Sequence, residues 1–238
     1  MSAKQALVLL PGLLNDKRVF GPQIAALRSR AEIVAPELWH VDSIAAMVDI
    51  VLAQAPPTFS LAGFSMGGYV ALEVFRRAPK RVRRLALIDT TARPETPEGR
   101  RRRQALVAQT KLGRWRGITQ IMLPMLIHPD RLKDKALVNV LQEMAMTVGA
   151  DGYTNQQRAI MARRDNMKLL PKIDVPTIVV VGREDQVLPP SFSEELAAGI
   201  KGSRLLVLER CGHVAPLEQP AGVTAALREW LLAGGGRS

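Results

Sequence analysis

Six short apolar runs recur along the chain, bounded by glycine and proline residues. Several of these runs are continuously apolar and do not alternate with polar residues, which is typical of strands that are covered on both faces in a parallel sheet. We therefore predict strands over residues 6–10, 32–35, 59–63, 85–88, 177–181 and 204–208.

Segments with helical spacing of apolar residues separate most of these runs. Residues 43–54 carry such a pattern, with Asp42 or Ser43 as the candidate N-cap. Similar patterns cover residues 67–78, 191–199 and 221–232. The alternation of strands and helices predicts right-handed crossovers and an α/β fold, a mostly parallel open sheet with helices on both faces.

The alternation stops between residues 89 and 176, where no strand pattern occurs. An all-helical insertion between two core strands predicts a cap over one edge of the sheet. We expect residues 1–92 and 171–238 to form the core domain, residues 93–170 to form the helical cap, and the glycine-rich residues 234–236 to form a flexible end. Within the cap, helix-prone stretches cover residues 97–111, 117–127, 134–147 and 154–165.

One motif joins a predicted strand to a predicted helix. It reads Gly63-Phe64-Ser65-Met66-Gly67-Gly68, and a serine at such a turn, flanked by glycines two positions away, is typical of a nucleophile elbow. The turn is so sharp that a Cβ atom at either flanking position would strike neighbouring backbone. The motif lacks the Gly-Lys-Ser/Thr of a phosphate-binding loop. We therefore predict Ser65 as a nucleophile.

A serine hydroxyl needs a base, and the base needs a carboxylate partner. His213 follows the last predicted strand, which returns its imidazole to the carboxyl edge of the sheet where Ser65 lies. Asp185 follows the strand at residues 177–181 and is the candidate acid, whereas its neighbour Glu184 should point elsewhere. Asp89 is the alternative acid, although capping of the backbone at the two following threonines is the role that we favour for it.

An acyl-transfer site also needs N–H donors for the oxyanion that develops on the substrate. The backbone N–H of Met66 is one candidate, because it opens the helix after the nucleophile. The second candidate is the backbone N–H of Leu13, in the loop after the first strand, where Gly12 lets the chain turn. Because both donors belong to the backbone, their side chains are free to vary.

These motifs together resemble the α/β-hydrolase superfamily, in the branch of small cofactor-free carboxylesterases with a helical cap, and are similar to pimeloyl-carrier-protein methyl esterases. The resemblance covers residues 6–232 and includes the chain order nucleophile, acid, base. It departs from the common family pattern at Pro11, where a histidine often stands. The resemblance implies catalysis without a metal or an organic cofactor. Its motifs are Leu10-Pro11-Gly12, the Ser65 motif, residues 182–185, Gly212-His213 and Glu218-Gln219-Pro220.

Positive charge is concentrated in the predicted cap. The chain has a net charge of +11, and residues 95–170 alone contain fourteen Lys and Arg against seven Asp and Glu. Such a surface can attract an anionic substrate or an acidic acyl carrier protein, although a merely solvated surface is the interpretation that we favour. Nucleic acid is not expected as a partner, since aromatic residues make up only 4% of the chain and no binding motif accompanies the charge.

Composition excludes several other classes. The single cysteine, Cys211, cannot close a disulfide within the chain or build a multi-thiolate metal site. No apolar run approaches the roughly 18–20 residues that cross a bilayer. Pro11 and Gly12 interrupt the apolar run near the N-terminus, which indicates a strand and a loop, not a signal peptide. We expect a cytoplasmic monomer or homodimer without membrane insertion and without a metal site.

The leading functional prediction is serine hydrolysis of a small-molecule carboxylic ester, or of a thioester, through an acyl-enzyme. A carbon–carbon bond hydrolase or lyase with the same triad is the second interpretation. A non-catalytic ligand receptor on the same fold is the third, because fold alone does not determine function. Five cap residues are candidates to line an aliphatic acyl pocket, although a buried packing face is the use that we favour for them: Ile121, Met122, Leu123, Met125 and Leu126.

Overall fold

The computed structural model describes residues 4–233, so the glycine-rich end of the chain lies outside the described residues. Its centre is a six-stranded sheet in the order β2-β1-β3-β4-β5-β6, and all neighbouring strands pair in parallel. The predicted α/β fold is therefore confirmed. The strands are β1 (Gln5–Leu10), β2 (Ala31–Val34), β3 (Phe59–Phe64), β4 (Val82–Ile88), β5 (Thr177–Gly182) and β6 (Arg204–Leu208).

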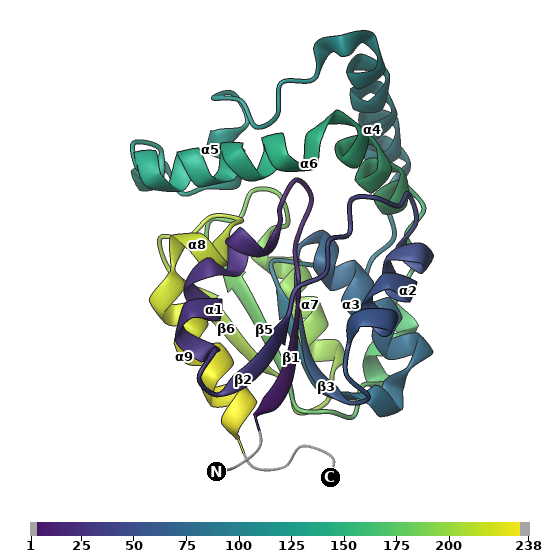
Figure 1. Cartoon of the computed structure of the whole chain (residues 1–238), viewed down its shortest axis with the longest axis vertical. Coiled ribbons are helices and arrows are strands. Elements are labelled where there is room, and N and C mark those ends of the chain that lie inside the picture. The colour runs from purple at the N-terminus through teal and green to yellow at the C-terminus, as the bar shows by residue number, and fades with distance from the viewer. Residues whose placement is uncertain (1–3, 234–238) are drawn as a thin grey trace.

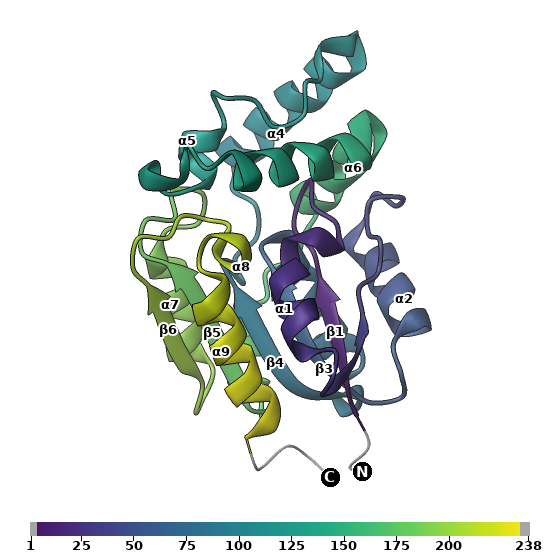
Figure 2. The same cartoon turned by 60° about the vertical axis from the view of Figure 1, so that its left-hand side comes forward.

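Helices cover both faces of the sheet (Figures 1 and 2). Two of them, α1 (Gly21–Leu27) and α9 (Pro220–Leu232), lie side by side on one face (Figure 2). The other face carries α2 (Ile44–Gln54), α3 (Met66–Arg77) and α7 (Pro190–Gly199), whose apolar side chains share one core cluster. Of the two candidate N-caps, Ser43 is the one that caps α2, by accepting a hydrogen bond from the N–H of Ala46.

The packing of helices on both faces of the sheet explains why the strands are continuously apolar. In β1, Leu7 and Leu9 belong to the core cluster beneath α1 and α9, whereas Val8 and Leu10 belong to the cluster beneath α2 and α3. All four side chains have no exposed surface. Because neighbouring side chains in a strand point to opposite faces, a strand that is buried on both faces needs apolar residues at every position.

The segment between β4 and β5 contains helices and lies above the carboxyl edge of the sheet (Figures 1 and 2). We call this segment, residues 93–170, the helical insertion. Its helices are α4 (Pro97–Gln109), α5 (Leu123–Leu126) and α6 (Lys135–Met161). The insertion packs onto the core through buried side chains such as Leu141 and Met144.

The structure differs from the predicted elements in three places. The two stretches predicted at residues 134–147 and 154–165 form one helix, α6, which is broken at Gly149 by a backbone with φ 71° and ψ 179°. The stretch predicted at residues 117–127 is helical only over α5. Two short helices were not expected: α1 and α8 (Ala215–Glu218). In the described part of the chain, no helix has both the length and the apolar character needed to cross a membrane.

Candidate active site

Ser65 occupies the sharp turn between β3 and α3. Its backbone lies at φ 52° and ψ −116°, a strained conformation for a residue with a side chain. A Cβ atom at Gly63 would overlap the backbone of Gly67, so the turn requires glycine at this position. The N–H of Ser65 donates a hydrogen bond of 2.9 Å to the carbonyl of Ile88, which fixes the turn against β4.

His213 follows β6 on a loop that brings its imidazole to the serine. The distance from His213 Nε2 to Ser65 Oγ is 2.9 Å, and the histidine is 5% exposed. The ring also packs against Phe64, with 5.4 Å between the ring centroids. Its backbone N–H donates to the carbonyl of Leu126 in the helical insertion, at 2.9 Å. The insertion therefore helps to position the imidazole.

Asp185 lies on the far side of the imidazole. Its Oδ2 atom is 2.8 Å from His213 Nδ1, and the residue is 3% exposed. Its Oδ1 atom accepts the N–H groups of Val187 and Leu188 at 2.8 and 2.9 Å. A carboxylate beside Nδ1 favours the tautomer that carries its proton there, which leaves Nε2 free to accept the proton of Ser65. The structure thus brings the three predicted residues into one hydrogen-bonded chain.

The two alternative acids do not touch the imidazole. Glu184 points elsewhere, as expected, because its Oε2 atom accepts the backbone N–H of Cys211 at 2.9 Å. Asp89 has no exposed surface and accepts the N–H groups of Gly182 and Ala215 at 3.0 and 3.3 Å. Asp89 therefore joins the ends of three chain segments around the site. The expectation that it caps the backbone at the two following threonines is wrong.

The charge of Asp89 is disfavoured in this place. Burial raises the pKa of its carboxyl well above the usual value, and the negative charge of nearby Asp185 raises it further. The two backbone N–H groups partly oppose the shift. A carboxyl group that is hard to ionise is a poor partner for an imidazolium, which favours Asp185 over Asp89 as the acid.

The two candidate oxyanion donors line the same cavity as Ser65. Met66 opens α3, where the first N–H groups of a helix lack partners within the helix. Leu13 precedes Leu14, which has a positive φ of 59°. The N–H of Leu14 donates at 3.0 Å to Oε1 of Gln156, a buried side chain from α6. Sequence reasoning missed Gln156, since no local pattern marks a contact between residues so far apart in the chain.

Glu218 was also missed as a site residue, although it belongs to a quoted motif. It is 1% exposed and accepts the N–H of Val214 at 3.1 Å and that of His128 at 2.6 Å. Arg131 Nη1 donates to its carbonyl at 2.5 Å. Burial raises the pKa of Glu218, and the backbone hydrogen bonds oppose the shift. Glu218 therefore ties the loop of His213 to the helical insertion.

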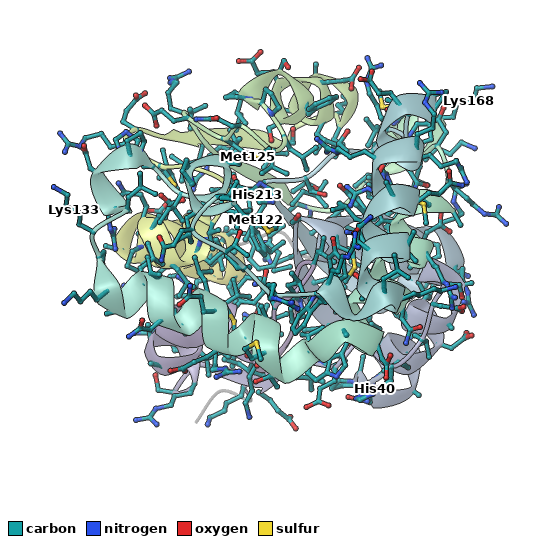
Figure 3. All side chains as sticks on the ribbon, turned by 90° about the horizontal axis from the view of Figure 1, so that it is seen from above. His40, Met122, Met125, Lys133, Lys168 and His213 are labelled. Atoms are coloured by element: carbon teal, nitrogen blue, oxygen red, sulfur yellow. The ribbon has the colours of Figure 1, made fainter. Side chains whose placement is uncertain are left out.

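A cavity of about 480 Å³ opens beside Ser65 and His213, and two of the five candidate residues, Met122 and Leu126, line it. Figure 3 shows Met122 beside His213 in the view from above. The expectation is wrong for Ile121, which is 88% exposed, and for Met125, which is 46% exposed. Leu123 is fully buried in the core. Further apolar lining comes from Ile118, Leu141 and Ile160.

The other two histidines lie outside this arrangement. His40 is at the periphery of the molecule, away from His213 (Figure 3), and its Nε2 atom is 3.3 Å from a carboxylate oxygen of Glu37. His128 accepts the N–H of Asp130 through Nδ1. Across residues 4–233, no three His, Cys, Asp or Glu side chains are grouped so that they could hold a metal ion.

The sequence of this chain matches the model of the alpha/beta hydrolase family over residues 7–227. The chain belongs to the α/β-hydrolase family. It is 35% identical to the pimeloyl-[acyl-carrier protein] methyl ester esterase of Neisseria meningitidis serogroup B, over 81% of this chain and 76% of that relative. The enzyme of the same name from a serogroup A strain is 33% identical to this chain, over 96% of this chain and 77% of that relative.

Solved structures of α/β-hydrolases superpose closely on this one. A thermophilic esterase from Thermogutta terrifontis, solved with malate bound, has a TM-score of 0.89 and 29% identity, over 96% of this chain and 90% of its own. The enol-lactonase of Burkholderia xenovorans has a TM-score of 0.84 and covers 98% of this chain, but at 24% identity it shows the fold alone. With esterases among its relatives, this α/β-hydrolase is an enzyme of the hydrolase class.

Proposed function

We propose that this α/β-hydrolase is a serine carboxylesterase in which Ser65, His213 and Asp185 form the catalytic triad. The observation that carries the proposal is the continuous hydrogen-bonded chain from Asp185 Oδ2 through the imidazole to Ser65 Oγ. Ser65, at the end of this row of hydrogen bonds, lies at the wall of a cavity with apolar and basic lining. A serine, a base and an oriented carboxylate in this geometry are the parts that nucleophilic acyl transfer requires.

In the first half-reaction, Ser65 Oγ attacks the ester carbonyl while His213 Nε2 takes the hydroxyl proton. Asp185 holds the imidazole in place and stabilises the imidazolium that forms. The backbone N–H groups of Leu13 and Met66 donate to the oxyanion of the tetrahedral intermediate. When this intermediate collapses, the ester C–O bond breaks, and His213 gives its proton to the departing alcohol. Ser65 then carries the acyl group.

In the second half-reaction, a water molecule attacks the acyl-enzyme. His213 takes a proton from the water, the oxyanion again binds the two backbone N–H groups, and the bond between Ser65 and the acyl carbon breaks. His213 returns the proton to Ser65 Oγ. The products are the free acid and the regenerated enzyme.

We assign residues 93–170 as a cap domain and residues 1–92 and 171–238 as the catalytic core. The cap supplies apolar lining to the cavity through Ile118, Met122 and Leu126. It also contacts the catalytic loops through Gln156 and through the carbonyl of Leu126. These contacts support a role in holding the acyl chain and in keeping the site in its working geometry.

An acidic acyl carrier protein is the partner that we propose for the basic cap. The relatives from Neisseria meningitidis are named for a pimeloyl-[acyl-carrier protein] methyl ester, and the cap of this chain carries most of its excess positive charge. An ester borne by such a carrier would be guided to the cap by long-range attraction. The cytoplasmic location and the monomeric or homodimeric state remain predictions from the sequence.

Hydrolysis of a series of p-nitrophenyl esters by wild type and Ser65→Ala tests the proposed activity. The variant should lose a factor of roughly 10⁶ in kcat, because removal of the nucleophile disables the triad. Ser29→Ala is the matched control, since Ser29 is exposed between α1 and β2 and does not line the cavity. Activity of Ser65→Ala within tenfold of wild type would contradict the assignment. Activity confined to carbon–carbon substrates would instead support the second interpretation of the same triad.

A further inference from the structure

One wall of the cavity carries two arginines that share a single carboxylate. Arg103, on α4, donates from Nε to Oε2 of Glu95 at 2.5 Å, and Arg163, just after α6, donates from Nη1 to the same oxygen at 2.9 Å. All three residues line the cavity together with Ser65 and His213. Their side chains are largely buried, with 17% of Arg103, 8% of Arg163 and 8% of Glu95 exposed.

The cluster holds more positive than negative charge. Burial opposes ionisation of Glu95, but the hydrogen bonds from the two arginines outweigh it and lower the pKa of this carboxyl below its usual value. One carboxylate therefore faces two guanidinium groups, which leaves a net charge of +1 in the wall of the cavity. A buried charge without a counter-ion is costly, so this excess charge favours the binding of an anion.

The arginines also keep donors available for such an anion. Arg163 Nε donates to the carbonyl of Arg93 at 3.0 Å, and Arg103 Nη1 donates to Oε1 of Gln157 at 2.6 Å. Among residues 4–233, no hydrogen bond from the Nη2 atom of either arginine is observed. A guanidinium group matches a carboxylate well, because its N–H groups point in the directions of the two oxygens.

The position of the cluster relates it to the nucleophile. The guanidinium of Arg163 lies over the ring of Tyr69, 4.6 Å from the ring centroid, in a cation–π contact. Tyr69 is four residues after Ser65, about one turn along α3, and lines the same cavity. The apolar side chains of Ile118 and Ile160 line the cavity as well. A chain of methylene groups bound in this cavity can therefore join an ester at Ser65 to an acid group at the arginines.

We propose that Arg103 and Arg163 form a carboxylate subsite, and that the preferred small-molecule substrates are half-esters of dicarboxylic acids. The ester carbonyl of such a substrate binds at Ser65, its methylene chain lies against the apolar lining, and its free carboxylate pairs with the two arginines. The proposal rests on the proposed esterase function and deepens it. Because the arginines are buried in the cavity wall, they select a group on the substrate itself and not an acidic surface on a carrier protein.

Matched pairs of substrates test this subsite. The p-nitrophenyl half-esters of succinic, glutaric and adipic acid are compared with the p-nitrophenyl esters of butyric, pentanoic and hexanoic acid. For the best chain length, wild type should favour the half-ester at least tenfold in kcat/KM, mainly through a lower KM. Arg103→Met and Arg163→Met should bring this ratio close to one. Glu95→Gln should raise it, because this change removes the carboxylate that competes for the arginines.

Arg164→Met is the matched control, since Arg164 is the exposed neighbour of Arg163, and its ratio should equal that of wild type. Equal kcat/KM values for the paired substrates in wild type would overturn the subsite and leave the esterase function standing. Calorimetry with Ser65→Ala adds a readout that is independent of turnover. Monomethyl adipate should bind at least tenfold more tightly than methyl hexanoate, and equal affinities would overturn the subsite even if no ester were hydrolysed. Should Arg163→Met fail to fold, Arg103→Met and Glu95→Gln still decide the outcome through their opposite expected shifts.

Discussion

In the proposed triad, the protonation state of a single imidazole determines whether Ser65 can react. His213 must carry its proton on Nδ1 so that Nε2 can accept the proton of the serine, and Asp185 is the group that enforces this state. Asp185 is itself held by two backbone N–H groups on its other oxygen. The carboxylate is therefore fixed before a substrate arrives, and the imidazole needs no rearrangement during the reaction.

Replacement of the acid should affect turnover much more than replacement of its neighbour. Asp185→Asn should lower kcat by about 10⁴, because the amide can stabilise the wrong tautomer of His213. Glu184→Gln should stay within about tenfold of wild type, because Glu184 contacts the backbone of Cys211 and not the imidazole. The measurement is kcat for a p-nitrophenyl ester. A larger loss in Glu184→Gln would show that the acid is misplaced by one residue, and a larger loss in Asp89→Asn would favour Asp89.

The sequence predicts the three residues of the proposed triad because each one lies at a recognisable place. Ser65 stands in a local motif, and Asp185 and His213 each follow a strand whose carboxyl end meets the same edge of the sheet. Gln156 and Glu218 could not be predicted in the same way. Their roles depend on contacts with residues 142 and 90 positions away, and no local pattern encodes such contacts.

At the scale of elements, the loops that carry the proposed base and the proposed oxyanion donor are bonded to the helical insertion. The loop of His213 is bonded to the insertion through the carbonyl of Leu126 and through Glu218. The loop that carries Leu13 is bonded to α6 through Gln156. A displacement of the insertion would therefore disturb both the base and the oxyanion donors. In the proposed mechanism, this coupling gives the helical insertion a part in catalysis as well as in enclosing the substrate.

Glu218 should make the stability of the protein depend on pH. Because burial raises its pKa in the folded state, its contribution to stability is complete below the usual value and is lost as pH rises through the raised value. Unfolding in urea between pH 4 and pH 8 should therefore show that wild type loses free energy of unfolding relative to Glu218→Gln as pH rises. The variant should also be destabilised by about 1–3 kcal/mol at low pH, because an amide leaves backbone N–H groups unpaired.

Glu209→Gln is the control for this measurement, since Glu209 is an exposed residue in a surface ion pair with Arg183. Its difference from wild type should stay small across the same pH range. A difference between wild type and Glu218→Gln that is constant or grows with pH would contradict the assigned direction of the pKa shift.

Regular elements with a two-sided apolar pattern were predictable, whereas short or broken ones were not. All six strands lie where the apolar runs indicate them, because burial on both faces leaves a clear signal. The short helices α1 and α8 have 7 and 4 residues, too few to show a periodic pattern. Two separate helices were expected at residues 134–147 and 154–165, but α6 continues after a local break at Gly149.

For the whole molecule, the basic cap has two distinct parts. Arg103 and Arg163 are buried in the wall of the cavity, whereas Arg100 and Arg101 are exposed on α4. From the sequence alone, the positive charge of residues 95–170 is expected to form one surface. Its exposed members can contact a partner directly, whereas Arg103 and Arg163 are paired with Glu95 and face the cavity.

Salt should separate these two kinds of charge. If the exposed arginines guide an acyl carrier protein, raising the ionic strength from 0.1 to 1 M should weaken hydrolysis of a carrier-borne ester much more than that of a small neutral ester. The Debye length falls over this range from about 10 Å to about 3 Å. A double change of Arg100 and Arg101 to Gln should raise KM for the carrier ester at low salt. Equal salt slopes for the two substrates would contradict the role of a carrier protein.

Covalent labelling tests the central claim most directly. A fluorophosphonate reacts with an activated serine, so treatment of the wild-type chain should give one adduct, located on Ser65 by peptide mass spectrometry, with activity lost in proportion to labelling. Ser65→Ala should take up no label. An adduct on a different residue, or full ester hydrolysis by a chain whose Ser65 is completely labelled, would contradict the proposed nucleophile.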